Sequence, residues 1–168
     1  MGTDSTAYDI VLVLHILAVI FGFGPLVLSG LYDVVSAKRG RRQAAAVGEV
    51  QYAVAKTAEK VVYLVFVFGV ALVLMSDGAW SMGDLWISLS MLTYVLAIGL
   101  SHGMLMPNER RLNAVKAELA ALEDANTRAT PEQEGRLAAL TKRSAAVGTV
   151  LDLMLVFIVY LMVFKPGM

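Results

Sequence analysis

Three ionisable side chains lie within long apolar stretches of this sequence, and they are its main candidates for chemistry. His15 lies in the first stretch, His102 near the end of the third and Asp152 in the fourth. An ionisable group in hydrocarbon costs several kcal/mol, so each of the three is a candidate functional residue. A neutral imidazole offers one nitrogen lone pair, which suits a haem iron or a copper ion.

Depth along the helices predicts the neighbours of His15. His15 lies about one and a half turns inside the first stretch. Met91 and Tyr94 of the third stretch lie level with it or slightly deeper, and Tyr160 of the fourth lies level. We predict that these four residues form a cofactor site, with haem b as the main candidate and copper as the less favoured one. His15 would be the metal ligand, Met91 a second, softer ligand and Tyr160 a hydrogen-bond partner. Alternatively, His15 is a neutral histidine satisfied by a tyrosine hydroxyl or a backbone carbonyl.

A second polar group is predicted near the opposite ends of the apolar stretches. Asp152 lies about 10 Å into the fourth stretch and His102 lies within about one turn of the same depth. Lys56, Glu59 and Lys60 enter the second stretch at the same end. We predict an inner polar cluster in which Asp152 pairs with His102 or a lysine. Such a cluster could bind an anionic headgroup, hold a haem propionate or relay a proton; alternatively, it is a neutral pair that fixes helix register.

The two histidines cannot share one haem. They lie on parallel helices, one near each face, and should be roughly 15–20 Å apart along the membrane normal.

Glycines add a further pattern: Gly22, Gly24 and Pro25 interrupt the first stretch, and Gly99 and Gly103 form a GxxxG pair. Both patterns let another helix, or in the first case a flat cofactor, approach closely.

The elements that position these residues are four membrane-spanning helices. Hydrophobic residues make up 58% of the 168 residues and charged residues only 17%, which is too apolar for an ordinary soluble domain. About 20 mainly apolar residues span the hydrocarbon as a helix. The sequence predicts one all-α membrane domain, a four-helix bundle, with spans at residues 10–31, 56–75, 85–106 and 145–164.

Charge predicts the orientation of this bundle. Thirteen of the fourteen Lys and Arg lie in the connections at residues 32–55 and 107–144 or at the start of the second span, and only Lys165 lies at the other side. The positive-inside rule then places these loops in the cytoplasm and both termini outside, in a bacterial inner membrane. Trp80 and Trp86 fit an interfacial aromatic belt at the outer face.

The loops themselves are predicted to be helical. Leu112, Val115, Leu119 and Leu122 form an apolar stripe on a charged segment. Residues 130–133 (TPEQ) read as an N-cap, a proline at the first helical position and a capping-box glutamine. Residues 41–60 look similarly helical. We expect these cytoplasmic extensions to pack on each other rather than on a partner.

The opening stretch reads LHILAVI at residues 14–20, followed by Gly22 and Gly24. This pattern, with the four-helix layout, resembles an uncharacterised family of bacterial predicted integral membrane proteins related to copper-resistance protein D. It is similar, more distantly, to the membrane protoporphyrinogen oxidase of haem synthesis, which implies a haem ligand at His15. No tryptophan follows His15, and the oxidase's tyrosine–proline–arginine stretch is missing, which speaks against oxidase activity.

Three functions follow as alternatives: a haem- or metal-binding redox protein, a non-catalytic accessory or scaffold subunit of a larger membrane complex, and a transporter-like oligomer. The sequence has no cysteine, so thiolate metal sites and iron–sulfur clusters are excluded. It also lacks a phosphate-binding loop, a zinc motif and a Ser–His–Asp pattern. The expected partners are the lipid bilayer and either further copies or a larger complex, with no nucleic acid.

Overall fold

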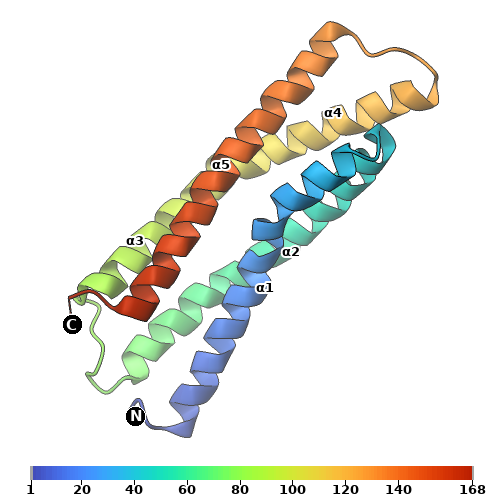
Figure 1. Cartoon of the computed structure of the whole chain (residues 1–168). Helices are drawn as coiled ribbons and strands as arrows, with labels where there is room; N and C mark the ends of the chain where they lie inside the picture. The colour runs from blue at the N-terminus through green and yellow to red at the C-terminus, as the bar shows by residue number, and fades with distance from the viewer. Residues whose placement is uncertain (1, 168) are drawn as a thin grey trace.

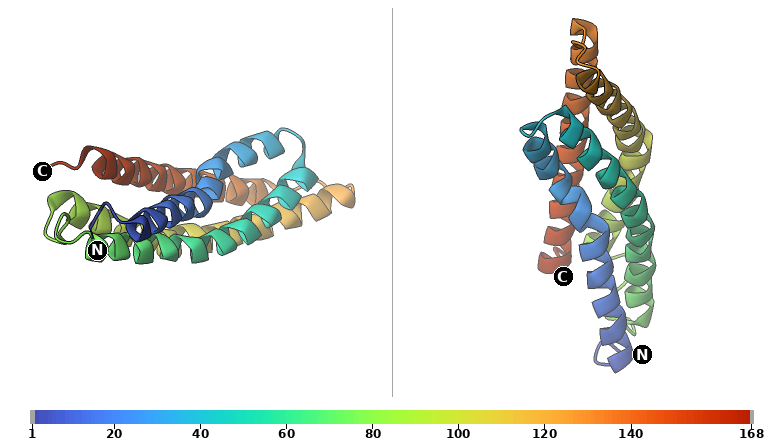
Figure 2. Two further views of the ribbon diagram at one scale, coloured as in Figure 1. Left: turned by 90° about the horizontal axis from the view of Figure 1, so that it is seen from below. Right: turned by 90° about the vertical axis from the view of Figure 1, so that its right-hand side faces the viewer.

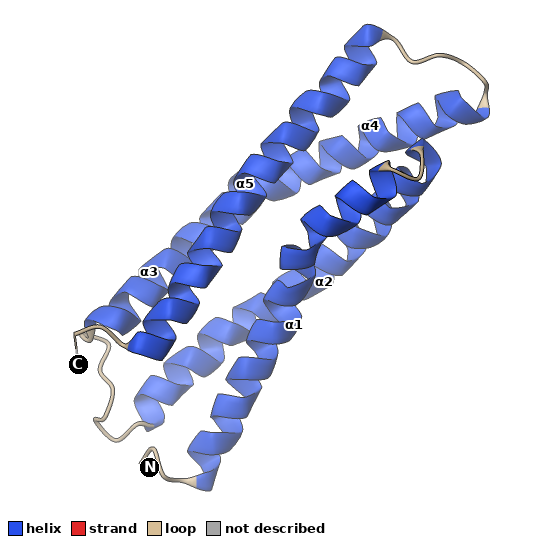
Figure 3. Ribbon diagram, viewed as in Figure 1, coloured by secondary structure: helices blue, strands red, loops and turns tan. Residues whose placement is uncertain are grey.

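A computed structural model of the chain describes residues 2–167. Its regular elements are α1 (Thr6–Ala37), α2 (Arg41–Met75), α3 (Leu85–Leu100), the π-helical turn η1 (Ser101–Leu105), α4 (Met106–Asp124) and α5 (Pro131–Phe164). Throughout the described residues the regular structure is helical, with short connections between helices (Figure 3). The all-α prediction is confirmed.

The helices form two hairpins that lie side by side. In the first, α1 and α2 run antiparallel and pack along their lengths; in the second, α3, η1 and α4 follow one another and pack on α5 (Figure 1). Both termini and the α2–α3 connection lie at one end of the bundle, called here the terminal end. The α1–α2 turn and the α4–α5 loop lie at the other, the basic end, where the α4–α5 tip projects furthest (Figures 1 and 2).

The surface of the bundle is suited to lipid. Four helical segments are long and apolar enough to cross a membrane: Thr6–Ala37, Arg41–Met75, Leu85–Asp124 and Pro131–Phe164. Each contains one predicted span. Large apolar side chains such as Phe21, Leu74 and Leu153 are mostly exposed on them. Since the apolar faces point outward as well as inward, the chain is an integral, multi-pass membrane bundle.

The predicted helical extensions are present at the basic end. Thr130 accepts a hydrogen bond from the Gln133 amide, and the Gln133 side chain accepts one from the Thr130 amide, which completes the predicted capping box. Leu112, Val115 and Leu119 of α4 are almost fully buried where α4 packs on α2 and α5. The extensions therefore pack on each other, as expected from the apolar stripe.

Two glycines allow the closest helix approaches. A Cβ on Gly22 would lie 3.0 Å from Val62 Cγ2 and 3.2 Å from the Val62 nitrogen, so α1 crosses α2 there. A Cβ on Gly48 would lie 2.5 Å from Asn113 Oδ1, where α2 meets α4. By contrast, Gly99 and Gly103 have open space where a Cβ would stand, so this GxxxG pair has no packing partner within residues 2–167.

Candidate functional site: an apolar cavity at the terminal end

A cavity of about 480 Å³ lies between the two hairpins in the half of the bundle nearer the terminal end. Residues from α1, α2, α3 and α5 and from the α2–α3 connection line it, and nearly all of them are apolar or aromatic. The volume lies in the range of ligand pockets, about 300–1,000 Å³. The cavity has few polar groups, so the position of each one matters.

His15 is the ionisable residue that the cavity shares with the predicted cofactor site. The imidazole lies within hydrogen-bonding range of the Val65 carbonyl of α2. Its Nδ1 is buried and makes no hydrogen bond of regular geometry within the described residues. The ring faces the backbone of α2, since a Cβ on Gly69 would lie 3.3 Å from His15 Cε1 and 3.7 Å from Nδ1. Gly69 thus makes room for the imidazole. Because Nδ1 is turned to α2, Nε2 is the nitrogen left for a ligand in the cavity.

Met91 and Tyr94 line the same cavity as His15, whereas Tyr160 is not among its lining residues. The Tyr94 hydroxyl donates a hydrogen bond of 2.9 Å to the Val62 carbonyl, and its ring stacks on Phe66 at 5.7 Å between centroids. Tyr160 is 48% exposed and packs on Phe164. The structure therefore brings together three of the four residues predicted for the cofactor site.

The part of the cavity at the terminal end of the bundle is called here its mouth, and Tyr8, Trp80, Trp86 and Lys165 line it. The sequence indicated the two tryptophans only as a membrane-interface belt. Trp80 and Trp86 meet edge to face with centroids 5.6 Å apart, and the Lys165 ammonium lies 4.0 Å from the Trp80 ring centroid. Trp80 Nε1 donates to the Tyr8 hydroxyl at 3.1 Å. Lys165 could have been singled out in the sequence as the one cation on its side of the bundle.

His102 forms a separate contact at η1, and it does not line the cavity. Its Nδ1 donates to the Ile98 carbonyl at 3.0 Å, and its Nε2 faces the Glu59 carboxylate at ion-pair distance and the Tyr63 hydroxyl at 3.1 Å. π-Helical turns are rare and recur at functional sites. Here the turn presents His102 to α2 and joins the hairpins.

The other members of the predicted inner cluster do not join this contact. Lys56 lies over the Tyr52 ring at 5.0 Å. Asp152 and Lys60 form no ion pair within residues 2–167. The partner of His102 is therefore Glu59, and the pairing of Asp152 with His102 or a lysine is not formed.

Polar contacts also join helices nearer the basic end, and the sequence reading did not foresee them. Lys116 Nζ of α4 lies 2.8 Å from Asp33 Oδ1 of α1, so this pair connects the two hairpins. Asn108 of α4 donates to the Leu140 carbonyl at 2.9 Å and to the Ser144 hydroxyl at 2.7 Å, both in α5. The Asn108 hydrogen bonds therefore hold the second hairpin together.

Glu109 lies beside this group, just beyond the predicted third span. Burial raises the pKa of the Glu109 carboxyl; a hydrogen bond from Ser144 lowers it, the Asp33 carboxylate raises it and the Lys116 ammonium lowers it. The net direction is upward. Folding therefore favours the protonated form of Glu109.

Glu109→Gln is expected to raise the midpoint of thermal unfolding in detergent at about pH 8 but not at about pH 4. The folded-state pKa lies above the unfolded-state pKa, so the stability from neutral Glu109 is complete below the unfolded value. It is lost as the pH rises through the folded value. Glutamine keeps the neutral shape at every pH. An equal gain at both pH values would show that ionisation of Glu109 is not the cause.

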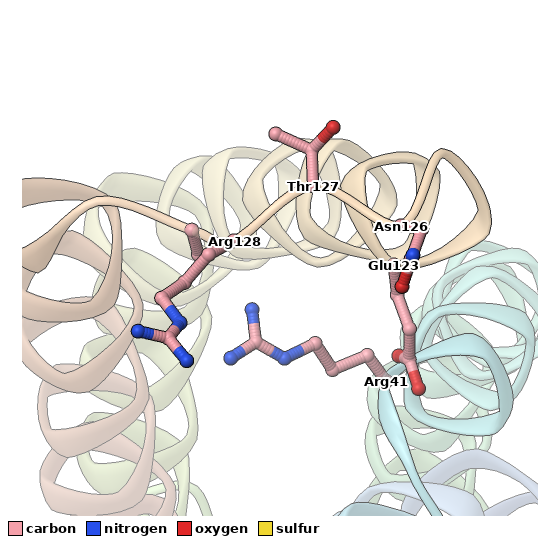
Figure 4. A pocket seen from close by; sticks show the side chains of 6 residues that line it. Arg41, Glu123, Asn126, Thr127 and Arg128 are labelled. Atoms are coloured by element: carbon pink, nitrogen blue, oxygen red, sulfur yellow. The ribbon is translucent and has the colours of Figure 1, made fainter.

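A second cavity, of about 410 Å³, lies at the basic end beside the α4–α5 loop. Figure 4 shows the guanidinium groups of Arg41 and Arg128 pointing toward one another across it. Arg41 already pairs with Glu134, and Glu123 also lines the opening. Because acidic and basic groups are mixed there, the charge does not favour one class of ligand.

Metal ligands are sparse in the bundle. Within the described residues, no three His, Asp or Glu side chains come close enough to hold a metal ion together. A copper ion in the cavity would depend on His15 and the Met91 thioether. Haem, which supplies four of its own nitrogen ligands, asks for only one or two protein ligands.

Comparison with known proteins gives one family. A family model described as "Predicted integral membrane protein (DUF2269)" matches residues 9–166. No curated protein and no solved structure matches the chain.

Proposed function

Because this chain belongs to the DUF2269 family of predicted integral membrane proteins, we propose a function from the cavity itself: it binds haem b through His15 in a redox or cofactor-handling role. The observation that carries the proposal is an imidazole set in an otherwise apolar cavity and held against α2, so that Nε2 is the nitrogen left for a ligand. A nitrogen lone pair among apolar side chains is costly unless it is paired, and an iron at Nε2 would pair it.

The residues around the cavity fit the chemistry of a haem. His15 would supply the axial nitrogen, and Met91 lines the same cavity as a candidate second ligand. Aromatic and aliphatic side chains would exclude water from the macrocycle. Bound haem would supply one-electron chemistry. Relation to copper-resistance protein D and to the haem-synthesis oxidase stays a prediction from the opening helix.

We further propose that the terminal end faces outward from a bacterial inner membrane. The distribution of Lys and Arg supports this orientation, because the connections at the basic end carry nearly all of them. The haem site would then lie in the outer half of the bilayer. A reporter enzyme that works only outside the cytoplasm should therefore be active when it is fused to the C-terminus.

The visible spectrum of the protein tests the haem proposal. Protein expressed with a haem precursor and purified in mild detergent is expected to show a Soret band, and His15→Ala is expected to abolish it. His102→Ala is the matched control, because His102 lies outside the cavity and pairs with Glu59. Loss of the band in both variants, or a colourless wild-type protein that binds no added haemin, would contradict the proposal.

The second candidate function is a non-catalytic subunit of a larger membrane complex. Gly99 and Gly103 support it, since they offer a close-approach surface that no other part of residues 2–167 covers. A colourless protein that co-purifies with a larger complex would favour this function over haem binding.

A further inference from the structure

We propose that the cavity takes an amphiphile with a carboxylate, and that Lys165 pairs with this carboxylate at the mouth. The inference rests on the proposed function only in using the same cavity; it does not require iron or His15. It concerns the polar end of the ligand, whereas the haem proposal concerns the metal.

Lys165 is held at the mouth by the backbone and by two rings. It follows the last turn of α5 in the left-handed conformation, with φ 44°, and its amide donates to the Leu161 carbonyl at 2.9 Å. Its ammonium lies 4.0 Å from the Trp80 ring centroid and 5.6 Å from that of Trp86. It makes no salt bridge within residues 2–167. Within this part of the chain the positive charge is thus positioned without an acidic counterpart.

Two further hydrogen-bond donors belong to residues that line the same cavity as Lys165. Trp86 is 7% exposed and lines the cavity, and its Nε1 is buried without a partner within the described residues. The Tyr8 hydroxyl also lines the cavity; since it accepts from Trp80 Nε1, its own proton is free to donate. An ammonium, an indole N–H and a hydroxyl proton together suit a carboxylate, which accepts at both oxygens.

The α2–α3 connection contains two acidic residues, Asp77 and Asp84, and neither lines the cavity. The Asp84 carboxylate accepts a hydrogen bond of 2.9 Å from the Ser81 amide at the start of α3. The mouth therefore offers donors and a positive charge, while the interior offers apolar surface. A molecule with one acidic end and an apolar body matches both.

Two sources share this chemistry: the propionates of haem b and the carboxylate of a fatty acid. In both, the acidic end would lie at the terminal end of the bundle. This differs from the sequence-based expectation that the inner polar cluster holds a haem propionate, since neither His102 nor Glu59 lines the cavity.

Intrinsic fluorescence can test the proposal without a label, because both tryptophans of the chain lie at the mouth. Protein in nanodiscs of zwitterionic lipid is titrated with a dibrominated fatty acid and, separately, with its methyl ester. The acid is expected to quench the tryptophan fluorescence at a concentration about tenfold lower than the ester does. An ion pair of the carboxylate with Lys165, supported by hydrogen bonds, would give a difference in affinity of this size. Equal quenching by acid and ester in the wild-type protein would overturn the proposal.

Variants then test whether Lys165 causes the preference for the fatty acid over its methyl ester. Lys165→Met is expected to remove this preference, and Lys165→Arg is expected to keep it. Lys60→Met is the matched control, since Lys60 lies outside the cavity. A preference that survives Lys165→Met, or falls equally in Lys60→Met, would overturn the assignment. The comparison of acid and ester in the wild-type protein needs no variant to fold.

A second experiment, with haemin, distinguishes haem propionate from fatty-acid carboxylate as the ligand. It also distinguishes the haem proposal from the carboxylate proposal. Haemin is compared with its dimethyl ester by Soret titration. Lys165→Met is expected to weaken haemin binding about tenfold without moving the band, because the axial ligand is unchanged. His15→Ala should lose the band yet retain the preference for fatty acid over ester. A wild-type protein that binds no haemin but prefers fatty acid over ester would refute the haem proposal and support the carboxylate one.

Discussion

Lys116→Met is expected to lower the free energy of unfolding by about 2 kcal/mol, because it leaves the Asp33 carboxylate without its partner. Lys116 Nζ lies 2.8 Å from Asp33 Oδ1, and the two side chains are 11% and 30% exposed. Removing one member of a fully buried pair costs about 3–5 kcal/mol; the partial exposure of Asp33 reduces this. Denaturant titration in mixed micelles, followed by circular dichroism, measures the change.

A double-mutant cycle distinguishes a stranded charge from lost packing. Asp33→Asn combined with Lys116→Met should recover part of the loss, because no unpaired charge remains. Arg42→Met is a control: Arg42 lies 3.9 Å from Asp124 with both side chains largely exposed, so its loss should change little. If the double variant were as unstable as the sum of the two single variants, no coupling between Lys116 and Asp33 would remain.

Gly22→Ala is expected to destabilise the bundle by about 1–3 kcal/mol, as overpacking of a close contact does. The new Cβ would meet Val62 Cγ2 at 3.0 Å and the Val62 nitrogen and Cα at 3.2 and 3.4 Å. The side-chain carbon can shift by rotation, but the backbone atoms cannot move without separating α1 from α2. Thermal unfolding in detergent, read by loss of helical signal or by aggregation, measures the effect.

Gly24→Ala is the matched control, two residues away in the same helix. Nothing lies within 4 Å of its Cβ position, so alanine should be neutral or slightly stabilising. Similar losses for Gly22→Ala and Gly24→Ala would mean that backbone effects, rather than the contact with Val62, set the cost.

Sequence patterns predicted the elements of this fold better than its contacts. Hydropathy predicts four spans because each helix presents apolar residues on several faces. The capping box at Thr130 and the stripe at Leu112, Val115 and Leu119 use only local spacing, so they too were predictable and are confirmed. Such signals do not depend on how the helices are rotated against one another.

For the candidate site, the sequence predicted the depth of each residue in the membrane but not the direction of its side chain. Counting residues along a helix gives depth, but the direction of a side chain turns by about 100° per residue, and packing fixes which direction faces a neighbour. Met91 and Tyr94 share both depth and direction with His15. Tyr160 was predicted to be level with His15 but lies exposed against Phe164. Depth alone could not separate these cases.

The partner of His102 was predicted only in part: Glu59 was placed in the same cluster, but the pair was expected with Asp152. The π-helical turn at Ser101–Leu105 adds residues to one turn and so changes the direction of every side chain after it. A regular α-helical count therefore misplaces this region. His102 lies within this turn and contacts Glu59 rather than Asp152.

The continuous helical segment Leu85–Asp124 has 40 residues, so at about 1.5 Å per residue it is roughly 60 Å long, about twice the hydrocarbon thickness. It forms part of the cavity wall at one end and reaches the α4–α5 tip at the other. Because α4 packs on α2 and α5 along the way, one continuous helical segment links the wall of the cavity to the loop that projects furthest from the membrane-spanning region.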